Sequence, residues 1–182
     1  MKKSILTLAF YGICSLTVML NRGFAQANIK EQGLADPKIL LGAIKLDDPS
    51  GNKGISPLSL TEVNSKALRE FRKEFKGVSN EEWFPISMGY SAEFTSESIR
   101  NTVVYDKKGN WKFTISHYSE YKLPAEIRAT VKSTYYDYSI TLVEEIHVQD
   151  KIIYLVHMQN ENTWKNVRIC DGDMELIEDF NK

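Results

Sequence analysis

The residues of this chain that could carry chemistry are few and widely spaced. His117, His147 and His157 are its 3 histidines, and no histidine or cysteine stands two to four residues from any of them. A zinc site needs three or four ligands that converge on the ion. The spacing therefore predicts that the chain has no metal site.

Nucleophilic catalysis would need a nucleophile, a base and an orienting group in contact. Cys170 and His157 are the one such pair that neighbouring strands could bring together. No nucleophile elbow or oxyanion-type glycine loop accompanies this pair, and the sequence has no phosphate-cradling glycine loop. We therefore predict a protein that is not an enzyme and holds no cofactor, in which Cys170 is a buried small hydrophobic residue.

Two acidic turns, at residues 106–109 and 171–173, could suggest calcium binding. A calcium loop needs more alternating oxygen ligands and a closing glutamate than either turn offers. Both turns are typical of β-hairpins, so we expect them to connect strands rather than to bind an ion.

The first 25 residues have the order of a secretory signal. A short basic start is followed by an almost wholly apolar run at residues 5–20 and by small residues around Ala25 and Ala27, after either of which cleavage would fit. The apolar run is shorter than the ~20 residues of a spanning helix. The pattern predicts a periplasmic or secreted protein with no stable membrane association after cleavage.

Removal of this signal changes the charge of the chain. The full sequence has 23 Lys and Arg against 24 Asp and Glu, and cleavage removes Lys2, Lys3 and Arg22, which leaves 20 against 24 and a net charge of −4. Nucleic acids and anionic membranes attract basic surfaces. The mature charge therefore argues against a nucleic-acid partner.

The elements that must position any site occur in two similar halves, at residues 58–122 and 123–182. The apolar helical stripe Ala67, Phe71, Phe75 and Val78 of the first half matches Ile127, Val131, Tyr135 and Tyr138 of the second. Residues 90–94 similarly match residues 154–158. Such an internal repeat predicts two copies of one supersecondary unit, each a helix followed by four antiparallel strands.

The first half is expected to begin with a helix near Ser59, because Ser59 and Glu62 have the spacing of a capping box and Gly77 suits the helix end. Strands are expected at residues 82–87, 90–95, 101–105 and 111–117, with a hairpin turn at residues 106–110. Pro85 cannot donate a ladder hydrogen bond, so the first strand should lie at a sheet edge or a bulge.

The second half is expected to open its helix at Pro124, which is preorganised for a first helical turn. Its strands should lie near residues 138–148, 151–159, 163–169 and 174–179. Residues 26–57 contain a run of turn-forming residues and are interpreted as an N-terminal lead-in or linker. Within them, residues 38–46 are apolar enough either to form a strand or to dock on the domain.

Two motifs carry a resemblance to a known family. The stretch Tyr105-Asp106-Lys107-Lys108-Gly109-Asn110-Trp111 and the helix start Leu123-Pro124-Ala125-Glu126-Ile127 stand within the helix-and-meander pattern of residues 58–182. Together they resemble the PepSY-like proteins of the bacterial periplasm, which are grouped with β-lactamase-inhibitor-like folds. The resemblance implies a secreted tandem domain without a cofactor or a known reaction, and a sheet face that grips a protein partner.

We predict an α+β fold in which the two tandem units form one curved antiparallel sheet with both helices on one face. Strand alternation selects the residues of the open face, which are Val104, Thr114, Ser116, Tyr118, Ile153, Leu155, His157 and Arg168. The first functional hypothesis is a non-catalytic inhibitor-like or adaptor protein that binds an unknown extracytoplasmic protein or peptide there. The alternatives are a small-ligand carrier with a pocket between sheet and helices, and an enzyme that uses His157 and Cys170.

Overall fold

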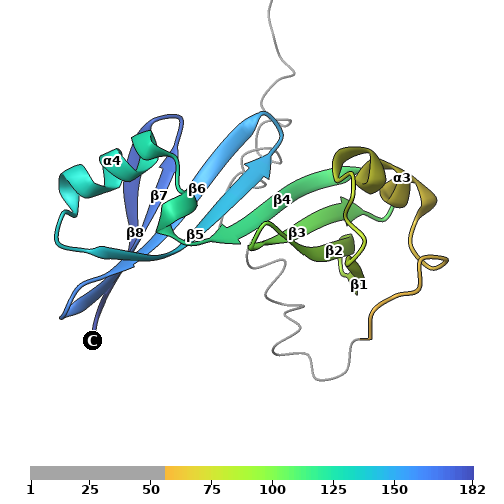
Figure 1. Ribbon diagram of the computed structural model, residues 1–182, viewed down its shortest axis with the longest axis horizontal. Coiled ribbons are helices and arrows are strands. Elements are labelled where there is room, and N and C mark those ends of the chain that lie inside the picture. The colour runs from red at the N-terminus through yellow and green to blue at the C-terminus, as the bar shows by residue number, and fades with distance from the viewer. Residues whose placement is uncertain (1–55) are drawn as a thin grey trace, which may run out of the picture.

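The computed structural model describes residues 56–182. The predicted signal peptide, nearly all of the lead-in and the apolar residues 38–46 lie outside the described residues. Through the described part runs one eight-stranded antiparallel sheet, in which each strand pairs with the next along the chain (Figure 1). The prediction of a single antiparallel sheet within an α+β fold is confirmed.

Two α-helices interrupt the succession of strands. The first part of the chain contains α3 (Ser65–Glu74), β1 (Glu82–Ile86), β2 (Gly89–Ser96), β3 (Ile99–Asp106) and β4 (Trp111–Tyr118). The second contains η1 (Glu120–Lys122), α4 (Ala125–Thr134), β5 (Ser139–Val148), β6 (Lys151–Gln159), β7 (Thr163–Cys170) and β8 (Asp173–Asn181). All eight expected strands are present, with ends within two residues of the expected ones, and Pro85 lies in the edge strand β1 as expected.

The first helix begins later than the sequence predicts. Ser59 and Glu62 do form the expected hydrogen bond, in which the Ser59 N–H donates to Glu62 Oε2 at 2.8 Å. This hydrogen bond closes a separate turn that precedes the helix. The helix starts at Ser65, where Asn64 Oδ1 accepts the Lys66 N–H at 2.9 Å. Asparagine satisfies an orphan helix N–H as well as serine does, so the local signal at Ser59 did not identify the true cap.

Both helices pack on the same face of the sheet. The cluster beneath α3 includes Val103, and the cluster beneath α4 includes Tyr118. Val103 pairs with Thr114 across β3 and β4, and Thr114 and Tyr118 point to one face because they lie an even number of residues apart on β4. Figure 1 shows the two helices near opposite ends of the curved sheet. We call this side the helix-bearing face and the other side the helix-free face.

The side chain of Asp106 stabilises the β3–β4 turn by accepting hydrogen bonds. Its Oδ1 accepts the N–H groups of Lys108 and Asn110, each at 2.9 Å, and its Oδ2 accepts the side-chain amide of Asn110 at 2.8 Å. Burial alone would raise the pKa of Asp106, but these hydrogen bonds and the charge of Lys112 together lower it to about 2. The turn also reaches α3, because Asn64 Nδ2 donates to the Lys107 carbonyl at 3.2 Å.

The depressed pKa of Asp106 predicts an acid-sensitive turn. Because the folded pKa of about 2 lies below the ordinary 3.8, the ionised carboxylate stabilises the fold above pH ~4, and this contribution is lost as the pH falls towards 2. We expect Asp106→Asn to be less stable than wild type at pH 6 and closer to it at pH 2.5. Urea unfolding at both pH values measures this, and a stability difference that does not change with pH would contradict it.

Candidate functional site

The sheet divides the eight predicted binding residues between its two faces. Partners across an antiparallel ladder share a face, and Val104 pairs with Phe113 whereas Thr114 pairs with Val103. The helix-free face therefore carries Val104, Ile153, Leu155, His157 and Arg168, and the helix-bearing face carries Thr114, Ser116 and Tyr118. The predicted grouping on one face is wrong because the face assigned to β4 by strand alternation was opposite to the face assigned to β3, β6 and β7.

The centre of the helix-free face is apolar and buried. Its cluster consists of Val104, Phe113, Ile115, Ile146, Val148, Ile153 and Leu155, each between 0% and 2% exposed. Three of the predicted binding residues, Val104, Ile153 and Leu155, therefore belong to this buried cluster. Side chains with so little exposed surface cannot contact a partner without rearrangement.

Aromatic side chains are exposed at one end of the same face. Trp164 on β7 and Phe180 on β8 are cross-strand partners and are 44% and 54% exposed. They border a groove of about 450 Å³, which is completed by Thr141, Leu142, His157 and Asn166. The Nζ of Lys182 lies 5.2 Å from the centre of the Trp164 ring. We call this surface the Trp164 groove.

The Trp164 groove was not fully predictable from the sequence. His157 is the one predicted binding residue that lines it. The sequence does not distinguish Trp164 from the buried aromatic residues, and the expected last strand, at residues 174–179, stops before Phe180. The available signal was the position of both aromatics in the final hairpin, where an edge strand has fewer neighbours to cover it.

Polar side chains separate the apolar centre from the Trp164 groove. His117 pairs with Glu144 across β4 and β5, and Glu144 Oε1 lies 3.2 Å from His157 Nε2. Burial lowers the pKa of His117, and the negative charge of Glu144 opposes this only in part. Arg168 lies on the same face and contacts Glu175 at 3.3 Å. The helix-free face thus changes from apolar to charged to aromatic along its strands.

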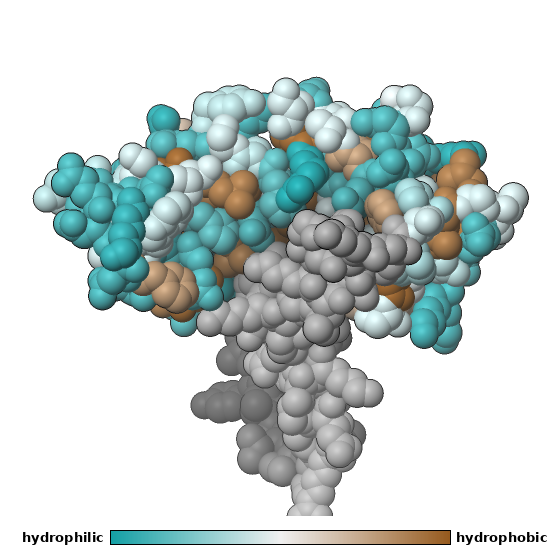
Figure 2. Space-filling model, turned by 90° about the horizontal axis from the view of Figure 1, so that it is seen from below, coloured by the Kyte–Doolittle hydropathy of each residue, from teal (hydrophilic) through white to brown (hydrophobic). Residues whose placement is uncertain are grey.

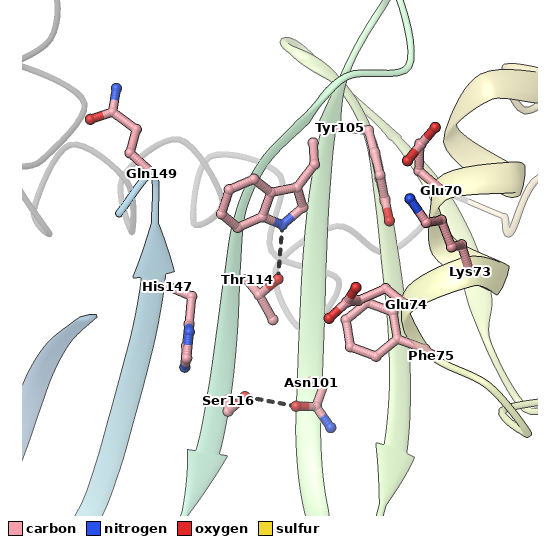
Figure 3. A pocket seen from close by; sticks show the side chains of 11 residues that line it. Glu70, Lys73, Glu74, Phe75, Asn101, Tyr105, Thr114, Ser116, His147 and Gln149 are labelled. Carbon is pink, nitrogen blue, oxygen red and sulfur yellow. Dashed lines mark hydrogen bonds between the residues drawn. The ribbon is translucent and has the colours of Figure 1, made fainter. Parts of the chain in front are cut away.

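A second groove lies on the helix-bearing face, between α3 and strands β3 to β5. Its volume is about 540 Å³, and it is lined by Glu70, Lys73, Glu74, Phe75, Asn101, Tyr105, Trp111, Thr114, Ser116, His147 and Gln149. In Figure 3, side chains from α3 stand on one side and His147 and Gln149 on the other, with Asn101, Thr114 and Ser116 between them. We call it the Trp111 groove.

Hydrogen bonds hold the floor of the Trp111 groove. Trp111 Nε1 donates to Thr114 Oγ1 at 3.0 Å, and Ser116 Oγ donates to Asn101 Oδ1 at 2.7 Å. Just beyond, Glu145 accepts from the Tyr118 hydroxyl and lies 2.5 Å from His147 Nε2. The hydrogen bond with His147 lowers the pKa of Glu145, and burial together with the Glu145 charge raises that of Tyr118.

The pair Cys170 and His157 does not form a catalytic arrangement. Cys170 pairs with Ile153 and His157 pairs with Asn166, so four residues of strand, roughly 13 Å, separate them along the sheet. Burial also raises the pKa of the Cys170 thiol, which disfavours the nucleophilic thiolate. Within residues 56–182, no three His, Cys, Asp or Glu side chains are grouped so that they could hold a metal ion.

Seen from below the view of Figure 1, the described residues present a largely hydrophilic surface with scattered hydrophobic side chains (Figure 2). No helix within residues 56–182 combines the length and the hydrophobicity that crossing a membrane requires.

No protein-family model matches the chain, and no curated protein matches it in sequence. Its fold resembles solved structures from Bacteroides. A DUF2874 family protein from Bacteroides uniformis has a TM-score of 0.53 and 15% identity over 65% of this chain and 89% of its own. A BLIP-like protein from Bacteroides fragilis has a TM-score of 0.52 and 16% sequence identity, and the match covers 65% of this chain and 86% of that protein. A protein from Bacteroides eggerthii described as a candidate periplasmic protein has a TM-score of 0.52 and 14% sequence identity. That match covers 65% of this chain and 88% of the other protein.

Proposed function

We propose that the mature chain is an exported, non-catalytic binding protein that uses the Trp164 groove to bind an extracytoplasmic protein or peptide. The observation that carries this proposal is the exposed cross-strand pair of Trp164 and Phe180 beside a groove lined by Leu142 and His157. Aromatic side chains that fill pockets supply much of the binding energy at protein interfaces. The polar and charged side chains beside the groove, His117, Glu144 and Arg168, would form the polar rim of such an interface.

The likeness in fold supports the same proposal. A BLIP-like protein and a candidate periplasmic protein share this architecture, and the N-terminal sequence has the features of a cleavable export signal. We further propose that the two halves of the chain are copies of one PepSY-like helix-plus-four-strand unit, whose duplication extends the sheet. Fold alone does not determine function, so the proposal rests on the groove rather than on the likeness.

The proposal is tested with the mature chain from Gln26 onward as bait in native periplasmic extract. The expected result is one saturable protein or peptide partner, identified by mass spectrometry. We expect Trp164→Ala and Phe180→Ala each to weaken its binding by about 10-fold or more, because truncation of a central aromatic anchor typically costs ~2 kcal/mol. Isothermal titration with the purified partner measures the change.

The matched control is Tyr136→Ala. Tyr136 is 83% exposed, directly follows Tyr135, the C-cap of α4, and does not line this groove, so its loss should leave binding unchanged. Equal affinities for the wild type and the Trp164 and Phe180 variants would rule out this groove as the binding surface. Charge substitutions at Leu155 or Tyr118 are unsuitable tests because both side chains are buried.

A small-ligand carrier is the second candidate, and the Trp111 groove favours it. This groove lies between a helix and the sheet and gathers several polar side chains around aromatic rings, as ligand sites commonly do. If the carrier function is correct, a small molecule should co-purify with the native protein in mass spectrometry, and Trp111→Ala should remove it. Co-purification that survives Trp111→Ala would exclude this groove as the ligand site.

A further inference from the structure

The exposed indole ring of Trp111 is held in one orientation. Trp111 is 38% exposed, and its Nε1 donates to Thr114 Oγ1 at 3.0 Å. The residue is also the cross-strand partner of Tyr105, next to the β3–β4 turn that Asp106 stabilises. Because the N–H is an indole's one polar group and is already bonded, the exposed part of the ring contacts a ligand through carbon atoms. A ring fixed in advance also loses little conformational entropy when a ligand binds.

The other aromatic rings among the described residues of the Trp111 groove belong to the core. Tyr105 is 1% exposed, and its ring centre lies 5.7 Å from that of Trp83. Phe75 is half-buried, and its ring centre lies 5.1 Å from that of Phe71 and 5.0 Å from that of Phe94. The groove therefore has one aromatic platform. Such a platform suits a ligand with a flat aliphatic C–H face, whereas quaternary ammonium groups are recognised by cages of several rings.

Polar groups on both sides of the groove are free to bond to a ligand. Lys73 and Glu74 belong to α3, and Gln149 lies on the opposite side, directly after β5 (Figure 3). With the rest of residues 56–182, these three side chains form no hydrogen bond or ion pair. One side thus provides an ammonium donor and a carboxylate acceptor, and the other provides an amide that both donates and accepts.

The charges of the lining nearly cancel. Glu70 and Glu74 stand with Lys73 along α3, and Arg69 Nε lies 3.9 Å from Glu70 Oε1. An anionic ligand would meet the carboxylates, and a cationic ligand would meet the ammonium group. A hydroxyl both donates and accepts, so it can bond to all three kinds of group. The groove's volume of about 540 Å³ is that of a small-molecule site. This lining fits an uncharged ligand with several hydroxyls.

We propose that the Trp111 groove binds a neutral saccharide. One pyranose ring places its C–H face on Trp111, and its hydroxyls bond to Lys73, Glu74 and Gln149. A pyranose combines the two required features, because its ring carbons carry C–H groups on a flat face while its hydroxyls project around the rim. The inference names the ligand class of the small-ligand function proposed above for this groove, and it rests on that function. It is independent of whether the Trp164 groove binds a protein.

A glycan array of neutral and charged saccharides, probed with the full mature chain, tests this proposal. We expect at least one neutral saccharide to bind, and isothermal titration then gives its affinity. Trp111→Ala should weaken binding by about 10-fold or more. Gln149→Asn should weaken it by about 5-fold, because the shorter side chain withdraws the amide. Asparagine tolerates the left-handed φ of 52° at this position, so the second variant tests the site even if Trp111→Ala does not fold.

Glu74→Gln distinguishes a saccharide from a cation. The amide oxygen still accepts from a hydroxyl, so the affinity for a saccharide should fall by no more than about 3-fold, whereas a cationic ligand would lose about 10-fold or more. The matched control is Tyr121→Ala, since Tyr121 is 71% exposed and does not line the groove. Its affinity should equal that of wild type.

The saccharide class is overturned if no neutral saccharide binds, or if binding survives unchanged in both Trp111→Ala and Gln149→Asn. A different kind of small molecule that co-purifies with the native protein and is lost in Trp111→Ala would overturn the saccharide class and leave the small-ligand function standing. An array without binding, together with native protein that carries no small molecule, would overturn both.

Discussion

Replacing Phe71 with alanine is expected to lower the free energy of unfolding by about 3–5 kcal/mol. Phe71 is a fully buried residue of α3, and its ring centre lies 5.1 Å from that of Phe75 and 5.4 Å from those of Trp83 and Phe94. Its removal would leave a cavity among aromatic rings that α3 and the first strands share. The loss is large because rigid rings cannot collapse fully into the space.

Urea unfolding followed by circular dichroism measures this effect. Tyr136→Ala serves as the control, since an exposed aromatic substitution should change stability by no more than ~0.5 kcal/mol. A loss below about 1 kcal/mol for Phe71→Ala would mean that α3 does not pack on the sheet as described. Because α3 forms one wall of the Trp111 groove, loss of α3 packing would also remove that candidate ligand site.

Replacing Gly109 with alanine is expected to cost about 2–4 kcal/mol. Gly109 has φ of 78°, where a side chain costs ~1–2 kcal/mol. A Cβ there would also lie 2.6 Å from Asn64 Oδ1 and 2.8 Å from the backbone nitrogen of Ala67. The first turn of α3 would have to move away from the β3–β4 turn, at an overpacking cost of roughly 1–3 kcal/mol.

Gly172→Ala separates the two contributions to this loss. Gly172 has a similar φ of 86°, but nothing lies within 4 Å of its added Cβ. It should therefore cost only the backbone strain of about 1–2 kcal/mol. Thermal or urea unfolding of both variants gives the comparison. Equal losses would show that the turn and α3 do not press against each other, whereas a larger loss for Gly109→Ala supports the contact.

The sequence by itself determined the local elements of this protein. Apolar spacing along α3 and α4, alternation along the strands, and the turn chemistry of Asp106 and Gly109 act over a few residues, so they can be read without knowledge of the rest of the chain. These signals predicted all eight strands and the α+β class. They failed at the start of α3, where Ser59 and Asn64 both offered capping chemistry and the fold selected Asn64.

Only the tertiary structure decided which side chains share a face and which reach solvent. Side chains alternate with a period of two, so a one-residue change in pairing moves a whole strand to the opposite face, as happened to Thr114 relative to Val104. Exposure depends on what packs above each position, which strand alternation does not specify. For this reason Leu155 is part of the core, whereas Trp164 stays exposed at the end of the sheet.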